Sequence, residues 1–123
     1  MYKFEKLEVW QLSIEYSDMI YEISTKLPEI ERFNLTSQII RATTSISLNI
    51  AEGSTGQTDP EQNRFLGIAL RSLIETVACM KLIQHRKYIS IENLDKTYTF
   101  SKFIAESPAA CRGDECVPYP RGL

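Results

Sequence analysis

The feature that most constrains the fold is an apolar stripe in the middle of the chain, with steps of three and four residues. Residues at this spacing lie on one face of an α-helix, so the stripe predicts an amphipathic helix with one buried side. Leu35-Thr36-Ser37 offers a hydroxyl cap at its start, and Gly53 marks its end. The stripe consists of Leu35, Ile39, Ala42, Ile46 and Ile50.

Residues 4–27 carry a second helical pattern, with acidic residues on the opposite side. Pro28 ends this helix, because the residue before a proline avoids the helical conformation. The residues that follow, to Asn34, form a short connection. The apolar positions expected inside are Leu7, Trp10, Ile14, Ile20 and Ile23.

Two more helices are predicted after a turn-rich segment. The third runs from residue 60 to residue 86 or 87, and Asp59 caps it with Pro60 in its first turn. The fourth spans about residues 91–105, with Ser90 as its cap. The apolar positions of the third are Leu66, Leu70, Leu73, Val77 and Met80, flanked by the small residues Ala69, Ser72 and Thr76, and those of the fourth are Leu94, Tyr98 and Phe103.

Four helices with short links and no convincing strand predict an all-α fold, an antiparallel up-and-down four-helix bundle. We expect this domain to occupy residues 1–107. Pro108 stops the last pattern, and residues 108–123 are expected to be an irregular tail.

Composition limits the functions that fit. The chain has 123 residues and a formal net charge of -2, so whole-molecule electrostatics do not favour nucleic acid or anionic membrane. It shows no apolar signal run and no stretch long enough to span a membrane, so we expect a cytoplasmic protein with no membrane partner. The three cysteines do not form a disulfide framework.

One side of the central helix is polar. Arg41, Ser45, Asn49 and Glu52 follow one another at helical spacing and can act together. They form either a binding stripe or a hydrogen-bonded seam that joins this helix to Glu75 or to the backbone of a neighbour. We favour the structural seam, because no nucleophile and base pair accompanies these residues.

A broken basic stripe follows on the third helix. It could contact phosphates, above all if several copies assembled side by side, although a solvated helix face is the favoured interpretation for a monomer. The stripe consists of Arg64, Arg71, Lys81, Arg86 and Lys87.

Catalytic and metal sites find no support. His85 is the single histidine, and a cation at a helix C-terminus suffices to explain it. Cys111 and Cys116 supply only two thiolates, which is too few for a structural zinc site. We therefore expect no catalytic residue, no metal, no cofactor and no small-molecule substrate.

The order of motifs resembles a known family, the four-helix-bundle proteins encoded in intervening sequences of bacterial 23S rRNA genes. That family includes the accessory variability protein of diversity-generating retroelements. The similarity covers most of the chain. It rests on Trp10, Leu27-Pro28, Glu31, Phe33, Leu35-Thr36, Arg41-Ala42, Ser45-Ile46, Asn49-Ile50-Ala51-Glu52-Gly53, Phe65-Leu66, Ser72-Leu73 and Glu75.

The resemblance implies a ring-like homopentamer with no enzymatic activity, and it adds RNA, DNA or a reverse-transcriptase-like protein as partners. Three departures bear on this. Thr55-Gly56 stands where the family often has Gly then Arg, which removes a cation, and Arg71 replaces a usual glycine. Pro108 also shortens the last helix.

Two functional hypotheses follow. The first is a non-enzymatic oligomeric adaptor that binds nucleic acid or a nucleic-acid enzyme. The second is a structural protein–protein interaction module with no nucleic acid binding. Homo-oligomerisation is expected in both, because one small bundle is not expected to bury Trp10, Tyr16, Tyr21 and Phe33 fully.

Overall fold

The computed structural model describes residues 1–56 and 58–107, and every regular element in those ranges is a helix. The four α-helices are α1 (Glu8–Thr25), α2 (Leu35–Gly53), α3 (Asp59–His85) and α4 (Ile91–Ala105). Two short 3-10 helices, η1 (Lys3–Lys6) and η2 (Glu29–Glu31), precede α1 and α2. The predicted all-α class with four helices is confirmed for these ranges. The predicted tail, residues 108–123, lies outside them.

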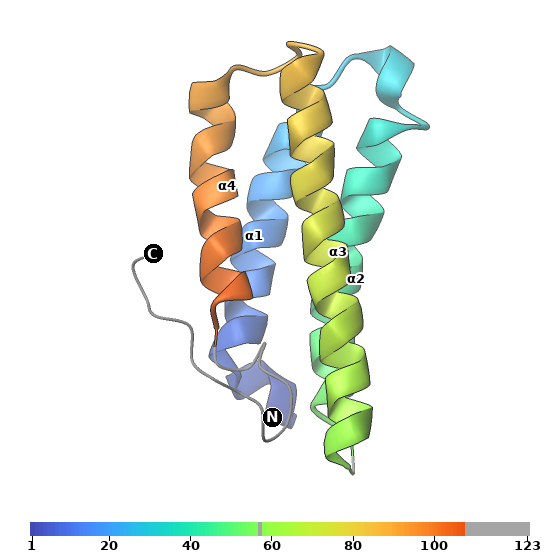
Figure 1. The fold of residues 1–123 in the computed structure, drawn as a ribbon, viewed down its shortest axis with the longest axis vertical. Coiled ribbons are helices and arrows are strands. Elements are labelled where there is room, and N and C mark those ends of the chain that lie inside the picture. The colour runs from blue at the N-terminus through green and yellow to red at the C-terminus, as the bar shows by residue number, and fades with distance from the viewer. Residues whose placement is uncertain (57, 108–123) are drawn as a thin grey trace.

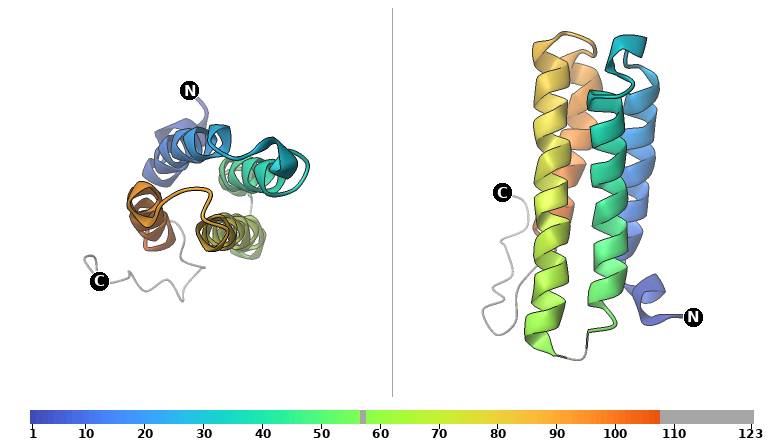
Figure 2. Two further views of the ribbon diagram at one scale, coloured as in Figure 1. Left: turned by 90° about the horizontal axis from the view of Figure 1, so that it is seen from above. Right: turned by 90° about the vertical axis from the view of Figure 1, so that its right-hand side faces the viewer.

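The four α-helices stand side by side along the long axis of the molecule (Figure 1). In the end-on view they occupy four corners, and α2 and α4 each contact both α1 and α3 (Figure 2). Successive connections lie at alternating ends, so η2 and the α3–α4 connection share one end of the molecule (Figure 1). None of the described helices has the length and apolar character needed to cross a membrane.

The first helix differs from its prediction in extent and in the face that it buries. Leu7 has φ −75° and ψ 126°, an extended conformation that separates η1 from α1 within the expected helix 4–27. Ile14, predicted to be inside, is 38% exposed. The inward line runs at steps of four and three through Val9, Ser13, Tyr16, Ile20 and Ile23.

The helix starts follow local rules with corrected positions. The N-cap of α2 is Asn34, so the hydroxyl cap predicted within Leu35-Thr36-Ser37 is wrong. The N-cap of α3 is Thr58, whose Oγ1 accepts a hydrogen bond from the Glu61 N–H at 3.3 Å. Asp59, the predicted cap, lies in the first turn, where its negative charge interacts favourably with the positive end of the helix dipole. Ser90 is the N-cap residue of α4, but its side chain makes no cap hydrogen bond.

The predicted apolar stripe of α2 is confirmed, because all five of its residues are buried. On α3, Leu73 and Met80 are buried and the other three predicted positions are partly buried. On α4, the bounds match the prediction, but Phe103 is 58% exposed. Its place inside is taken by Ile104, because the inward line of α4 runs Leu94, Thr97, Ser101 and Ile104.

Hydroxyl groups lie within the apolar core and pair across helices. Ser13 Oγ is 3.0 Å from Ser47 Oγ, which joins α1 to α2. Tyr16, predicted to remain partly exposed, is 0% exposed, and its hydroxyl is 2.7 Å from Thr76 Oγ1 on α3. Burial raises the pKa of Tyr16 to about 12, despite the hydrogen bond to Thr76. These pairs fix α1 against two neighbours at a specific height.

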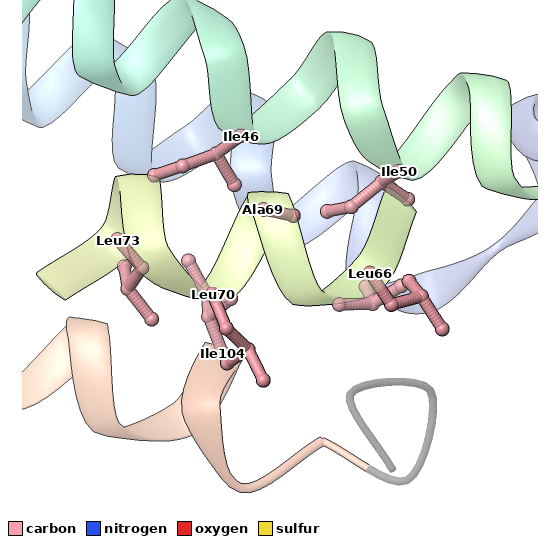
Figure 3. A pocket seen from close by; sticks show the side chains of 8 residues that line it. Ile46, Ile50, Leu66, Ala69, Leu70, Leu73 and Ile104 are labelled. Carbon is pink, nitrogen blue, oxygen red and sulfur yellow. The ribbon is translucent and has the colours of Figure 1, made fainter. Parts of the chain in front are cut away.

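A small apolar cavity lies between α1, α2, α3 and the end of α4 (Figure 3). Its volume is about 10 Å³, and Ile46, Ile50, Leu73 and Ile104 are among the residues around it. A space of this size holds at most one water, and the apolar lining offers that water no hydrogen-bond partner. The cavity is therefore a packing defect of the core and not a ligand site.

Candidate interaction surfaces

On the polar side of α2, the two middle residues are hydrogen-bonded to each other and the two outer residues are exposed. Asn49 Nδ2 donates to the Ser45 carbonyl at 2.8 Å and to Ser45 Oγ at 3.0 Å. Ser72 Oγ on α3 donates to Ser45 Oγ at 2.9 Å, which links the two helices. Arg41 and Glu52 are exposed, and within residues 1–56 and 58–107 their side chains make no hydrogen bond or ion pair. The structure thus brings Ser45 and Asn49 together with Ser72.

Glu75, the acidic partner considered for this side, is exposed on α3. Like Arg41 and Glu52, its side chain makes no hydrogen bond or ion pair in the part of the chain that the structure describes. Sequence reasoning placed Ser72 among the small residues of α3 but did not pair it with Ser45. Their separation of 27 residues leaves no local signal for that bond.

The same side of α2 forms an open depression with a volume of about 370 Å³. It is lined by α2 alone, with small polar side chains at its centre and larger ones around them. Leu48, which sequence reasoning missed, stands in this polar surface and is 60% exposed. The lining residues are Ile40, Arg41, Thr44, Ser45, Leu48, Asn49 and Glu52.

The five cations of the predicted basic stripe do not gather on one surface. Arg64 lies over the ring of Phe65, 5.4 Å from its centroid, near the start of α3. Lys81 turns toward α4, where Nζ is 4.5 Å from the centroid of the Tyr98 ring. Arg86 and Lys87 follow α3 at its far end, so Arg64 and Arg86 are about 33 Å apart along the helix axis. Arg71, exposed on α3, lies between these groups.

A buried carboxylate ties the two connections at that far end together. Glu31 of η2 is 5% exposed, and the Tyr88 hydroxyl donates to Glu31 Oε2 at 2.8 Å. Asn34 Nδ2 donates to the other oxygen at 3.0 Å. The Tyr88 hydrogen bond holds the pKa of Glu31 below its ordinary value, with smaller contributions in the same direction from Asn34 and Arg86. The same bond raises the pKa of Tyr88.

The α3–α4 turn presents its cations from a fixed backbone. Lys87 has φ 62°, the left-handed conformation that glycine adopts most easily after a helix. The Lys87 N–H donates to the Gln84 carbonyl at 3.0 Å, and the Tyr88 N–H donates to the Ile83 carbonyl at 3.2 Å. These two bonds form a Schellman motif, which fixes the position of Tyr88 beside Glu31.

Two large apolar side chains project from the same end of the molecule. Ile30 and Phe33 are 83% and 87% exposed, on either side of the buried Glu31 and the exposed Arg32. Arg32 lies over the Phe33 ring, 5.2 Å from its centroid. The sequence indicated that Phe33 is hard to bury but gave no such indication for Ile30. Together Ile30, Arg32, Phe33, Arg86 and Lys87 form a surface that we call the loop end.

The remaining candidate groups are not assembled into a chemical site. His85 is exposed at the end of α3. Cys79 is buried, and burial raises the pKa of its thiol. Among residues 1–56 and 58–107, no three histidine, cysteine or acidic side chains come together as metal ligands would. Cys111 and Cys116 lie outside the described residues.

Replacing Glu31 with glutamine is expected to lower the Tm by a few degrees near neutral pH. The folded state favours the charged carboxylate, so its contribution is complete above the ordinary pKa of 4.5 and is lost as the pH falls below it. The difference between Glu31→Gln and wild type should therefore shrink as the pH falls below 4.5 and Glu31 becomes protonated. Thermal melts followed by circular dichroism measure this.

The control for that prediction is Glu29→Gln. The Glu29 carboxylate is 84% exposed and pairs with Arg32 at 3.4 Å. An exposed pair of this kind contributes little, so this variant should melt as wild type does. If Glu31→Gln also melts like wild type at neutral pH, Glu31 does not hold the two connections together.

Comparisons with known proteins found one matching family model and a similar solved structure. The family model described as 23S rRNA-intervening sequence protein matches residues 5–106, which include all four α-helices. The fold is similar to the crystal structure of a protein with unknown function from the S23 ribosomal protein family of Bacteroides thetaiotaomicron. The two are 30% identical with a TM-score of 0.72, over 78% of this chain and 90% of that chain. No curated protein matches the chain.

Proposed function

This chain belongs to the 23S rRNA-intervening sequence protein family, and on that premise we propose that it is a non-enzymatic, homo-oligomeric adaptor that binds another protein. The observation that carries the proposal is the loop end. Ile30 and Phe33 are more than four-fifths exposed, while Glu31 between them is buried and doubly hydrogen-bonded. A rigid support that presents large apolar side chains to solvent is typical of a protein interaction site.

We also propose the topology of the bundle and the number of copies in the assembly. Connections at alternating ends support an antiparallel up-and-down bundle (Figure 2). The resemblance noted from the sequence adds a ring of five copies. Exposed apolar residues on α2 and α3, namely Leu48, Ile74 and Leu82, support burial in an assembly. The word ribosomal in the name of the S23 family describes that family and does not by itself establish ribosome binding.

Light scattering of the purified protein tests the assembly. A homopentamer has five times the monomer mass of 14.1 kDa. A mass that stays at 14.1 kDa at the highest concentrations measured contradicts the homo-oligomer.

Affinity capture tests the adaptor role. A protein partner should survive nuclease treatment and should be lost when Phe33 is replaced by serine. Phe103→Ser is the matched control, because Phe103 is also exposed but lies on α4, away from the loop end. Equal loss of the partner with both variants would contradict binding at the loop end.

Nucleic acid is a second candidate partner, and a specific observation supports it. The loop end combines an exposed aromatic ring with three cations, of which Arg32 pairs with Glu29 at 3.4 Å. Stacking beside positive charge is how proteins bind single strands. Its cations, Arg32, Arg86 and Lys87, lie in connections that Glu31 and Tyr88 join. The acidic balance of the whole chain opposes this reading, so binding here depends on local charge.

We predict that Arg86→Glu/Lys87→Glu weakens binding of a labelled single-stranded RNA by about tenfold or more at low salt. Two lost phosphate contacts should also reduce the slope of log K against log salt by about 1.4. Fluorescence anisotropy measures both quantities.

The matched control for the RNA experiment is Arg64→Glu/Arg71→Glu, an equal charge change on α3 outside the loop end. It should leave the affinity much closer to that of wild type. If wild type binds no RNA even at low salt, the second candidate is excluded while the protein adaptor stands.

A further inference from the structure

The outward side of α2 is self-complementary about its own midpoint. Arg41 and Glu52 are eleven residues apart, which is about three helical turns and about 16 Å, so they lie on one line along the helix. Both are exposed, and neither side chain has a partner within residues 1–56 and 58–107. Opposite charges thus stand at the two ends of one surface, with the open depression between them.

A two-fold axis between two antiparallel copies of α2, perpendicular to both helices and at the level between Ile46 and Ser47, reverses the height of every residue. Arg41 then lies at the height of Glu52 of a second copy. Leu48, which is 60% exposed, lies only about 2 Å along the helix from that level, so it faces Leu48 of the second copy across the axis.

The place of the two charges on α2 agrees with the burial pattern. In a helix of 3.6 residues per turn, the line through Arg41 and Glu52 runs between Ser45 and Leu48. This line faces away from the core, because Ile46 and Ile50 on the opposite side of α2 are buried. One antiparallel placement therefore brings both Arg41–Glu52 pairs together at the exposed surface. Hydrogen bonds to Asn49 and Ser72 keep the Ser45 side chain close to the helix surface.

We propose that two copies of this chain pair antiparallel through α2, with Arg41 of each copy against Glu52 of the other. The contact is isologous, since the same surface serves both copies. A second copy is the occupant because the charge pattern complements itself when reversed. The pairing deepens the proposed homo-oligomer but is independent of a five-membered ring. If that ring forms through other surfaces, α2 joins two rings into ten copies.

Each copy contributes one helix to this contact, so the contact buries less surface than a standard interface of about 1,600 Å². Pairing should therefore depend on protein concentration. The test is the dissociation constant of pairing, measured by sedimentation on the full chain. Arg41→Glu places two like-charged pairs in the contact, and so does Glu52→Arg. Each is expected to weaken pairing by about tenfold or more.

The charge swap makes the test specific. Arg41→Glu/Glu52→Arg restores opposite charges in both pairs, so it should pair within a few-fold of wild type. An equimolar mixture of the two single variants should also pair, because each supplies the charge that the other repels. Lys96→Glu, a charge reversal at an exposed position of α4, should leave pairing unchanged. Unchanged melting curves for every variant will show that folding is intact.

The outcomes separate the pairing from the ring. Ten copies that fall to five with either single variant support both, and two copies that fall to one support the pairing alone. A wild-type assembly of five that no variant changes overturns the pairing and leaves the ring. A wild-type monomer overturns both. A double variant that remains as weak as the single variants also overturns the antiparallel geometry.

Discussion

Replacing Tyr16 with alanine is expected to lower the free energy of unfolding by about 3–5 kcal/mol, the range for truncation of a buried aromatic side chain. Tyr16 is 0% exposed, its ring stacks on Phe100 with centroids 6.2 Å apart, and its hydroxyl meets Thr76. The substitution removes all three contacts and leaves a void where α1, α3 and α4 meet. Urea unfolding at fixed protein concentration measures the change.

Two variants separate the contributions of the ring and the hydroxyl. Tyr16→Phe keeps the ring and should cost only about 1 kcal/mol, because Thr76 Oγ1 still donates to the Leu73 carbonyl at 2.6 Å. Tyr21→Ala on the same helix truncates a ring that is 48% exposed and should cost much less than Tyr16→Ala. Equal losses for Tyr16→Ala and Tyr21→Ala would contradict the central position of Tyr16.

The raised pKa of Tyr16 predicts a loss of stability in alkali. The folded state favours the neutral phenol, so this contribution is intact below the ordinary pKa of 10.0 and is lost as the pH rises toward about 12. A pKa of about 12 instead of 10.0 corresponds to about 3 kcal/mol. Tyr16→Phe should remove most of the alkaline loss. A smaller part should remain, because the pKa of Tyr88 is also raised.

The burial of Tyr16 shows why α1 was harder to predict than α2. Along α2, five apolar residues at helical spacing are all buried, so spacing alone identifies the inward side although Thr43 and Ser47 are buried beside them. Along α1, the inward line includes Ser13 and Tyr16, whose hydroxyls are satisfied by Ser47 and Thr76 from other helices. A sequence pattern does not reveal hydrogen-bond partners 34 and 60 residues away. Apolar spacing therefore favoured Ile14 as a buried residue, whereas the structure shows it exposed.

The candidate surfaces were predictable to a similar degree. Helical spacing correctly placed Arg41, Ser45, Asn49 and Glu52 on one side of α2, because that relation is local. It did not show which of them bond to another helix. The contact between Glu31 and Tyr88 spans 57 residues and depends on the left-handed turn at Lys87, where a glycine would have been the usual signal.

Replacing Leu73 with alanine is expected to cost about 2–5 kcal/mol, and the upper half of that range is expected here. Leu73 is 1% exposed and forms part of the wall of the apolar cavity in Figure 3. The new void therefore joins a space that already exists, and the cost of such substitutions rises with the final cavity volume. Leu73→Met conserves volume and should cost less than about 1.5 kcal/mol.

The adjacent residue provides the matched control. Ile74 is 63% exposed, so Ile74→Ala removes a similar volume from the surface and should change the free energy of unfolding by about 0.5 kcal/mol or less in the monomer. Assembly adds concentration-dependent stability, so both variants must be compared at several protein concentrations. A loss for Ile74→Ala that grows with concentration would place Ile74 in an assembly contact. A small loss for Leu73→Ala at every concentration would instead contradict the packing of α3 against the core.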